Sequence, residues 1–369
     1  MMEVVIAGGG LAGSAAAIAL AKAGVEVILI ERETGPVHKI CGEFLSVEAQ
    51  TYLARLGLDI GAMGGAPVSR LRLVRGDRVV TTALPFQGMG LSRFTLDEAL
   101  LNHAAAYGVT VLRGHNIRSI GNDGVPVLDV KNHGLIRSKT LFLASGKHEM
   151  RGAKRVFGSP DDLIGFKNYF RLDARAHAAL IGHIELILFQ DGYAGLQPVE
   201  DGLVNLCLLI SRARFEKVGG KWDALFADLL KSSPYLAREL AGATQALDQP
   251  LAIYRVPFGF VYEPQDTDSR QIFRLGDQAG VIHSFTGDGM SIALHSASLA
   301  AEYYLKGESS LAYHRRLSRD IRGQIHRAGV LYKLNSHGWA QAGLFGLARL
   351  WPAGLRVAAN VTRLPLQPE

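Results

Sequence analysis

Apolar residues in the first part of the chain fall into three blocks with different patterns. Val4–Ala7 is a short, uninterrupted apolar run, and Val25–Ile30 is apolar except for Glu26. Both are typical of buried strands. Between them, an Ala-rich run from Ser14 to Ala23 favours helix, and Gly24 is expected to end it. The pattern predicts a strand, a helix and a second strand in succession, which is the βαβ unit of a parallel sheet.

The apolar pattern changes in the middle of the chain. From Leu163 to Ile210 it predicts successive strands, with Asp191-Gly192 and Asp201-Gly202 as hairpin turns, and Leu251–Tyr262 is expected to return as a strand. Such a change marks a second domain inserted into the first. We predict an α/β fold with a Rossmann-type nucleotide-binding domain (residues 1–67, 85–162 and 265–308), an inserted β-sheet substrate domain (68–84 and 163–264) and a C-terminal helical segment (309–369).

One helix start carries a residue that the helix does not explain. Thr95 is expected to be the N-cap, and Glu98 completes a capping box three positions later. Arg93 stands just before this cap and has no helical role there. A later helix is expected from Ser291 to Leu305, after the buried-strand run Gln271–Leu275.

Composition narrows the class of protein. The chain has 369 residues, 48% of them hydrophobic, which is enough for two or three domains with large cores. Its two cysteines, Cys41 and Cys207, are too few for a disulfide framework or a metal site, and no metal is predicted. No uninterrupted apolar run of about eighteen residues predicts a transmembrane helix. Together these features predict a cytoplasmic protein.

The formal net charge of +6 is concentrated late in the sequence. Between Leu311 and Leu364 stand nine arginines and lysines against a single acid, Asp320, and we expect helices there that lie over the substrate domain. Two interpretations stay open. The cations line a solvated helical face, or, because Trp339, Phe345 and Trp351 are interleaved with them, they bring the protein to an anionic membrane surface. No nucleic-acid motif accompanies the charge, so a nucleic-acid partner is not expected.

The turn after the first strand has the spacing G-x-G-x-x-G. Gly8 permits the tight turn, Gly10 lets the backbone approach a pyrophosphate, and Gly13 lets helix and strand pack closely. The helix N-terminus offers free N–H groups to phosphates. Glu31 ends the second strand, eighteen positions after Gly13. This is close to the spacing between the glycine motif and an acid that accepts a hydrogen bond from a ribose 2′-hydroxyl. The segment therefore predicts a dinucleotide site.

A second nucleotide-facing loop follows the strand at Gln271–Leu275. Gly276-Asp277 supplies a carboxylate suited to a polyol hydroxyl. Gly287-Asp288-Gly289-Met290 then opens a helix, whose N–H groups are suited to a developing anion. A loop of this kind is not part of a simple NAD domain.

These segments resemble the flavoproteins of the p-hydroxybenzoate hydroxylase and geranylgeranyl reductase superfamily. Gly8–Glu31, Arg93 with Leu96-Asp97 and Leu100, and Gly276-Asp277 with Gly287-x-Gly289 carry the resemblance, which covers most of the chain. It implies noncovalent FAD, whose ADP half, mid-chain phosphates and ribityl, and isoalloxazine edge the three segments would hold. The implied cofactor-binding residues are Gly8, Gly10, Gly13, Glu31, Arg32, Cys41, Gly42, Arg93, Gly276, Asp277, Gly287, Asp288, Gly289 and Met290.

The chain departs from each branch of that superfamily in places. Ser145-Gly146 stands where the hydroxylases carry Asp-Gly, although Arg151 sits where their arginine would be. Cys41-Gly42, Gly280 and Thr286-Gly287 look more like the geranylgeranyl reductase branch. The W-x-W-x-I-P signature of tryptophan halogenases is absent, which counts against halogenation.

The resemblance implies an enzyme in which NADPH or NADH transiently reduces the flavin. The reduced flavin then reacts with O₂, as in a monooxygenase that hydroxylates an apolar aromatic or polyketide-like small molecule, or it passes hydride to a C=C bond of a prenyl or other lipidic substrate. We place the monooxygenase first because that activity is more common on this fold. A flavin-binding protein without turnover is least favoured, since the loop Gly287–Gly289 offers an anion site that only catalysis needs.

Catalytic roles are predicted for Cys41, Gly287 and Gly289. Cys41 is expected beside the flavin ring as a proton donor, because cationic residues precede it and the resembling reductases carry Cys-Gly in this loop. The alternative is a small buried hydrophobe. The substrate pocket is expected to be apolar and to draw on strand residues, about half of which should belong to the core: Phe166, Tyr169, Phe170, Phe189, Tyr193 and Leu208.

Overall fold

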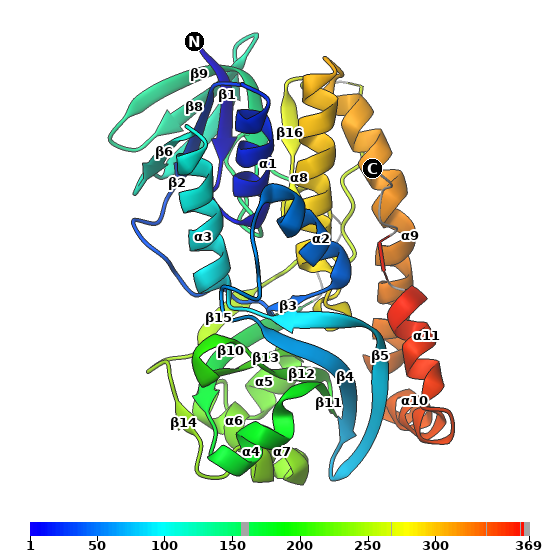
Figure 1. The fold of residues 1–369 in the computed structure, drawn as a ribbon. Helices are drawn as coiled ribbons and strands as arrows, with labels where there is room; N and C mark the ends of the chain where they lie inside the picture. The colour runs from blue at the N-terminus through cyan, green and yellow to red at the C-terminus, as the bar shows by residue number, and fades with distance from the viewer. Residues whose placement is uncertain (156–161, 267, 337, 362, 365–369) are drawn as a thin grey trace.

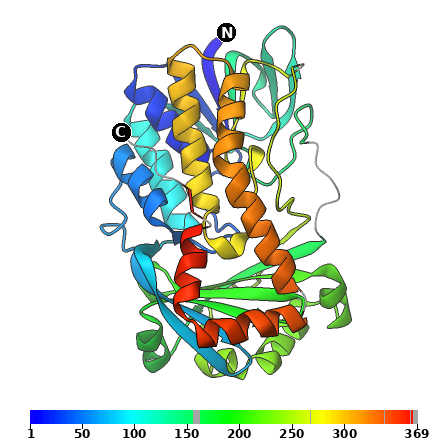
Figure 2. The ribbon, with the colours of Figure 1, turned by 90° about the vertical axis from the view of Figure 1, so that its right-hand side faces the viewer.

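The structure is a computed structural model that describes residues 1–155, 162–266, 268–336, 338–361 and 363–364. Two β-sheets lie one above the other, each covered by helices (Figure 1). Two long helices run down beside the upper sheet, and the chain ends in shorter helices beside the lower sheet (Figure 2). The architecture is the predicted α/β fold.

The upper sheet is the predicted βαβ unit extended by later strands. Its parallel strands follow the order β6-β2-β1-β9, with β16 also paired to β9. Antiparallel β8 and β7 continue it beyond β9. Because parallel strands place their carboxyl ends at one edge, that edge carries both glycine-rich loops. The strands are β1 (Met2–Ala7), β2 (Val27–Glu31), β6 (Thr110–Arg113), β7 (Ile117–Asn122), β8 (Pro126–Val130), β9 (Gly134–Leu143) and β16 (Ile272–Arg274).

Helices α1 (Leu11–Lys22), α3 (Arg93–Ala106) and α8 (Gly289–Leu305) cover one face of the upper sheet. The buried face of α1 consists largely of alanines, which lets α8 approach it closely. Helix α2 (Val47–Leu56) packs on the outside of α8. This packing fixes the N-termini of α1 and α8 at the same end of the sheet.

The lower sheet is the larger one and has the order β14-β10-β13-β12-β11-β4-β5-β3, with β15 also paired to β10. The turn residues Asp191 and Asp201 have positive φ between its strands, at the predicted turns. The strands are β3 (Phe44–Leu45), β4 (Ala66–Arg75), β5 (Arg78–Gly90), β10 (Leu163–Arg171), β11 (Gly182–Phe189), β12 (Gly192–Pro198), β13 (Val204–Ser211), β14 (Thr244–Gln245) and β15 (Leu251–Tyr254). Helices α4 (Ala174–Leu180), α5 (Arg212–Lys217), α6 (Trp222–Ser232) and α7 (Pro234–Glu239) cover its outer face (Figure 1).

The C-terminal helices connect the two layers. Helix α9 (Ser310–Ser336) packs along α8 and β16. Helices α10 (Gly338–Leu350) and α11 (Ala353–Val361) then lie against the lower sheet, where Phe345 of α10 is buried with Leu73 and Tyr193 (Figure 2). Among the described residues, no helix is both long and apolar enough to cross a membrane.

Three predicted element boundaries were wrong. Helix α3 begins at Arg93 and its N-cap is Ser92, not Thr95, because the Ser92 hydroxyl accepts the Thr95 N–H and is itself bound to the buried Glu200 carboxylate. Helix α8 begins at Gly289, two residues earlier than expected. The strand predicted over Leu251–Tyr262 ends at Tyr254, shortly before Pro257, which has no N–H to continue a ladder.

Candidate functional site

A cavity of about 1210 Å³ lies between the two sheets. Its wall runs from the Gly8 loop past residues 37–44 to the Gly287 loop, and on to strands of the lower sheet and to α10 and α11. Ligand pockets usually measure about 300–1000 Å³, so this cavity has room for a dinucleotide and a second molecule. The first part of the wall is polar and the part under α10 and α11 is mainly apolar.

The glycine motif between β1 and α1 has the close contacts that its spacing predicts. A Cβ on Gly8 would lie 2.5 Å from the Ala144 carbonyl oxygen, and Gly8 has a φ of +109°. A Cβ on Gly13 would lie 1.9 Å from the Gly8 carbonyl oxygen. Gly10 caps α1 without a side-chain hydrogen bond, so the first N–H groups of the helix stay available to a phosphate.

Glu31 is held against this loop at the end of β2. One carboxylate oxygen accepts the Gly9 N–H at 2.6 Å and the other accepts the Glu33 N–H at 3.0 Å. Both Glu31 and Arg32 line the cavity. A carboxylate can accept about four hydrogen bonds, so Glu31 keeps capacity for a ribose hydroxyl.

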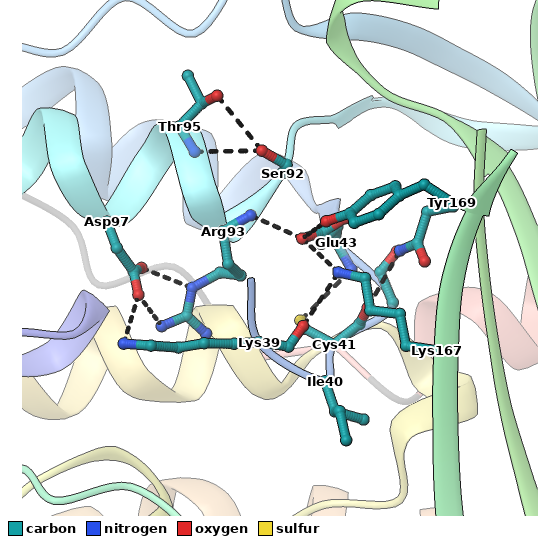
Figure 3. Close-up of polar contacts among 12 residues, drawn as sticks. Lys39, Ile40, Cys41, Glu43, Ser92, Arg93, Thr95, Asp97, Lys167 and Tyr169 are labelled. Atoms are coloured by element: carbon teal, nitrogen blue, oxygen red, sulfur yellow. Dashed lines mark hydrogen bonds and ion pairs between the residues drawn. The ribbon is translucent and has the colours of Figure 1, made fainter. Parts of the chain in front are cut away.

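Two cations converge on Gly10. The Arg93 guanidinium forms a bidentate pair with Asp97 at 2.6 and 2.9 Å, and the Lys39 ammonium lies 2.9 Å from the same carboxylate (Figure 3). A Cβ on Gly10 would be 3.5 Å from Arg93 and 3.6 Å from Lys39. Burial acts to raise the pKa of Asp97, but the two cations outweigh it and lower that pKa. The cluster leaves one net positive charge beside the helix N-terminus, a suitable place for a phosphate group.

The predicted proton donor, Cys41, lies in the cavity wall with Gly42. Its sulfur accepts the Glu43 N–H at 3.3 Å. The Asn205 side chain of β13 donates to the carbonyl oxygens of both Cys41 and Gly42, at 3.1 and 3.0 Å. The loop that presents the thiol is therefore fixed by the lower sheet as well as by its own backbone.

Behind Cys41 lies a buried charged cluster that links the two sheets. The Glu43 carboxylate is 2.5 Å from the Lys167 ammonium, and both side chains are fully buried. The Tyr169 hydroxyl donates to Glu43 at 2.8 Å, and the Arg93 backbone N–H donates at 2.7 Å (Figure 3). Lys167 also donates to the Lys39 carbonyl oxygen at 3.0 Å. Burial raises the pKa of Glu43, against the opposing effect of Lys167.

The second glycine-rich loop closes the other end of the polar wall. Gly276 and Asp277 line the cavity, and the Asp277 carbonyl oxygen accepts the buried Arg155 guanidinium at 2.6 Å. Arg151, which stands where the hydroxylases carry their arginine, is exposed and lines the cavity, whereas the contact with the Asp277 carbonyl oxygen is made by Arg155. Gly287 and Gly289 also line the cavity, with Gly287 packed against Phe44.

Most predicted cofactor residues meet at this one cavity, but Gly13 and Asp288 do not line it. Gly13 lies behind the cavity wall, where its backbone packs against Gly8. The Asp288 side chain is fully buried beside Arg363, which lies 3.4 Å away and also pairs with Glu48 at 2.9 Å. Burial raises the pKa of Asp288 to about 7, with Arg363 opposing the shift.

The strand residues expected at the substrate pocket divide between the cavity and the core, as predicted. Tyr193 and Leu208 line the cavity, whereas Phe166, Phe170 and Phe189 belong to the core beneath the lower sheet. Tyr169 serves the Glu43 cluster instead. The sequence analysis gave no role to Glu43 in the cavity wall, nor to three polar residues that hold the wall from behind: Arg155, Lys167 and Asn205. It indicated Lys39 only as a cation near Cys41, not as a partner of Asp97.

The fold and the cavity together are those of a dinucleotide-binding protein. Residues 1–130 match the family model described as an FAD binding domain. Menaquinone reductase of Mycobacterium tuberculosis is 25% identical over 81% of this chain and 76% of its own length. Tryptophan 2-halogenase of Chondromyces crocatus is 26% identical over 81% of this chain, which spans 60% of the halogenase's length. A flavoprotein/dehydrogenase from Cytophaga hutchinsonii has the same fold, with a TM-score of 0.81, 18% identity and coverage of 98% and 92% of the two chains.

The chain is an FAD-dependent oxidoreductase, and it is similar to flavoproteins of the kind that its motifs resemble. Its residues fit FAD. A side chain at Gly8 or Gly10 would fill the space that the cofactor needs beside the loop. The net positive charge of the Arg93, Lys39 and Asp97 cluster beside Gly10 suits a pyrophosphate. Glu31, Arg93 and Asp277 surround the first part of the cavity, where the cofactor would lie.

Replacing Glu31 by alanine is expected to weaken FAD binding by about 1–3 kcal/mol, because a charged hydrogen-bond partner of the ribose is lost. Titration of apoprotein with FAD, followed by flavin fluorescence, measures the change. Glu26→Ala, an exposed glutamate just before β2, is the matched control and should bind FAD as the unmodified protein does. Unchanged affinity in Glu31→Ala would remove Glu31 from the cofactor contacts.

Proposed function

We propose that the protein is an NAD(P)H-dependent flavin reductase that saturates a C=C bond in an apolar, lipidic substrate. The observation that carries this proposal is the position of Cys41, whose thiol lies in the wall of a large and mainly apolar cavity. The likeness to menaquinone reductase supports it, since that relative is named for the reduction of a lipid quinone.

When bound, reduced FAD supplies a hydride to one carbon of an electron-poor double bond. The other carbon needs a proton, which the Cys41 thiol would give. The Asn205 hydrogen bonds hold the Cys41 backbone in position. The thiol would then regain a proton from water that enters the cavity. The apolar wall excludes most water and orients a hydrophobic substrate by packing.

A monooxygenase is the second candidate. The halogenase relatives and a short match to a squalene epoxidase of Arabidopsis thaliana, 44% identical over 57 residues, favour it. Cys41 counts against it, because an accessible thiol in a cavity where oxygen chemistry occurs is open to oxidation to a sulfenic acid. This argument reverses the order in which the sequence alone placed the two candidates.

The reaction is tested by reducing the FAD-loaded protein with NADPH or NADH without oxygen and then adding a candidate oxidant. A menaquinone with a prenyl side chain, a geranylgeranyl lipid and an aromatic polyketide serve as probes. We expect a lipid probe to reoxidise the flavin without O₂ and to gain two hydrogen atoms by mass spectrometry. Reoxidation only by O₂, with one oxygen atom added to a probe, would favour the monooxygenase.

Replacing Cys41 by serine is expected to slow product formation by about 10²-fold or more, the usual contribution of a positioned general acid. FAD binding and flavin reduction by NAD(P)H should stay unchanged, because neither step needs this proton. Cys207→Ser is the matched control, since Cys207 also lines the cavity but burial raises its pKa to about 12. If Cys41→Ser gives the wild-type rate and the same products, Cys41 only packs, and the monooxygenase becomes the better proposal.

A further inference from the structure

Exposed apolar side chains are concentrated on the helices that end the described chain. Nine of the seventeen large hydrophobic residues exposed in the described part of the protein lie between Val330 and Val361. On α10 and α11 they form what we call the α10–α11 surface, made of Leu344, Leu347, Leu350, Trp351, Val357 and Val361. Leu350 is 87% exposed, and Trp351 and Leu347 are each more than half exposed. A concentration of this kind marks an interaction surface, because isolated exposed apolar residues are normal but clusters are not.

The same helices form part of the cavity wall. Leu344, Leu347 and Trp351 both line the cavity and are exposed to solvent, so these side chains stand between the cavity and the outside. On the inner side of α11, Leu355 and Ala358 continue the lining. A molecule that reached the α10–α11 surface could thus enter the cavity without crossing a polar barrier.

The charge around this surface has one sign. From residue 321 to residue 364 the sequence contains no aspartate or glutamate. Arg349 and Arg356 are exposed beside the apolar residues, and tryptophans stand at the start of α10 and at the turn between α10 and α11. Tryptophan flanked by arginine is typical of helices that lie in a membrane interface. A second copy of the chain would bring arginines against arginines, which disfavours a symmetric dimer here.

We propose that the α10–α11 surface docks on an anionic lipid bilayer and that the lipidic substrate enters the cavity from the bilayer between Leu344, Leu347 and Trp351. The helices would lie in the plane of the interface, with their apolar side chains among the acyl chains and the arginines at the headgroups. The substrate class, a membrane-resident lipid, rests on the proposed reductase function. The docking itself does not.

The test uses the full FAD-loaded protein and vesicles of phosphatidylcholine, with or without phosphatidylglycerol. We expect at least tenfold stronger sedimentation with the anionic vesicles, since each cation near the surface contributes roughly fivefold. Leu350→Glu/Val357→Glu, at two exposed residues that do not line the cavity, should lose at least tenfold of this binding. Leu135→Glu, an equally drastic change at an exposed leucine near the start of β9, is the control and should bind like the unmodified protein. FAD content confirms that each variant is folded.

An activity measurement then tests membrane docking and the proposed lipid substrate separately. A menaquinone embedded in anionic vesicles should be reduced by the unmodified protein and poorly by Leu350→Glu/Val357→Glu, while both reduce the same lipid in detergent micelles. Vesicle binding without turnover of any lipid would refute the proposed reductase and leave the docking standing. Equal sedimentation with both kinds of vesicle, none with either, or loss of a dimer in the double variant would overturn the docking.

Discussion

Replacing Lys167 by methionine is expected to destabilise the protein by about 3–5 kcal/mol, because it leaves the buried Glu43 carboxylate without its counterion. Neither side chain is exposed, so water cannot take the place of the ammonium group. The hydrogen bonds to Glu43 from Tyr169 and from the Arg93 backbone would remain. Denaturant unfolding of the apoprotein, followed by circular dichroism, gives the free energy of unfolding.

The double variant Glu43→Gln/Lys167→Met separates lost charge from lost packing. It removes both charges but keeps an oxygen that accepts from Tyr169, so it should recover much of the stability lost in Lys167→Met. Arg118→Met is the surface control, because Arg118 and its partner Asp129 are both partly exposed and such pairs contribute about 1 kcal/mol or less. A Lys167→Met protein within about 1 kcal/mol of the parent would show that Glu43 is buried uncharged.

Replacing Gly13 by alanine is expected to abolish FAD retention during purification. The new Cβ would lie 1.9 Å from the Gly8 carbonyl oxygen and 3.2 Å from the Ala144 Cβ, so the glycine loop must move. Overpacking of this kind costs about 1–3 kcal/mol or more, and here the displaced backbone is the surface that faces the pyrophosphate. Bound flavin per protein, read from the visible absorption spectrum, measures the effect.

Gly35→Ala is the control for Gly13→Ala, since a Cβ on Gly35 meets nothing within 4 Å. It should yield a yellow protein with normal FAD content. Wild-type flavin content in Gly13→Ala would mean that the loop tolerates displacement, and the close packing of α1 on β1 would not be required for cofactor binding.

The first glycine loop could be predicted from sequence because its parts are neighbours in the chain. The turn geometry of Gly8, the helix start at Gly10 and the acid at the end of β2 depend on local spacing that few alternative folds share. The cavity position of Asp277 followed from the resemblance and from the same rule about strand ends. The N-cap of α3 was misplaced, because Ser92 owes its position to Glu200, which is 108 residues away.

The charged cluster behind Cys41 could not be predicted from local pattern, since Glu43, Lys167 and Tyr169 come from different parts of the fold. One signal was available. Lys167 stands in the middle of a strand whose other residues up to Phe170 are all buried. A lysine is rarely buried without a partner, so its place in such a run required an acid nearby. The sequence could not say which acid that was.

Arg363 forms ion pairs with two acidic residues that are synthesised at very different times. It pairs with Glu48, made 315 residues earlier, and with Asp288, made 75 residues earlier. At about 5–20 residues per second, roughly 15–60 s of synthesis separate Glu48 from Arg363. Asp288, inside the loop Gly287–Gly289, is made about 4–15 s before Arg363 at the same rate and has no guanidinium beside it during that time. The surroundings of the loop Gly287–Gly289 are therefore completed late in translation. A nascent chain that already contains the glycine motif Gly8–Gly13 still lacks part of the cofactor site.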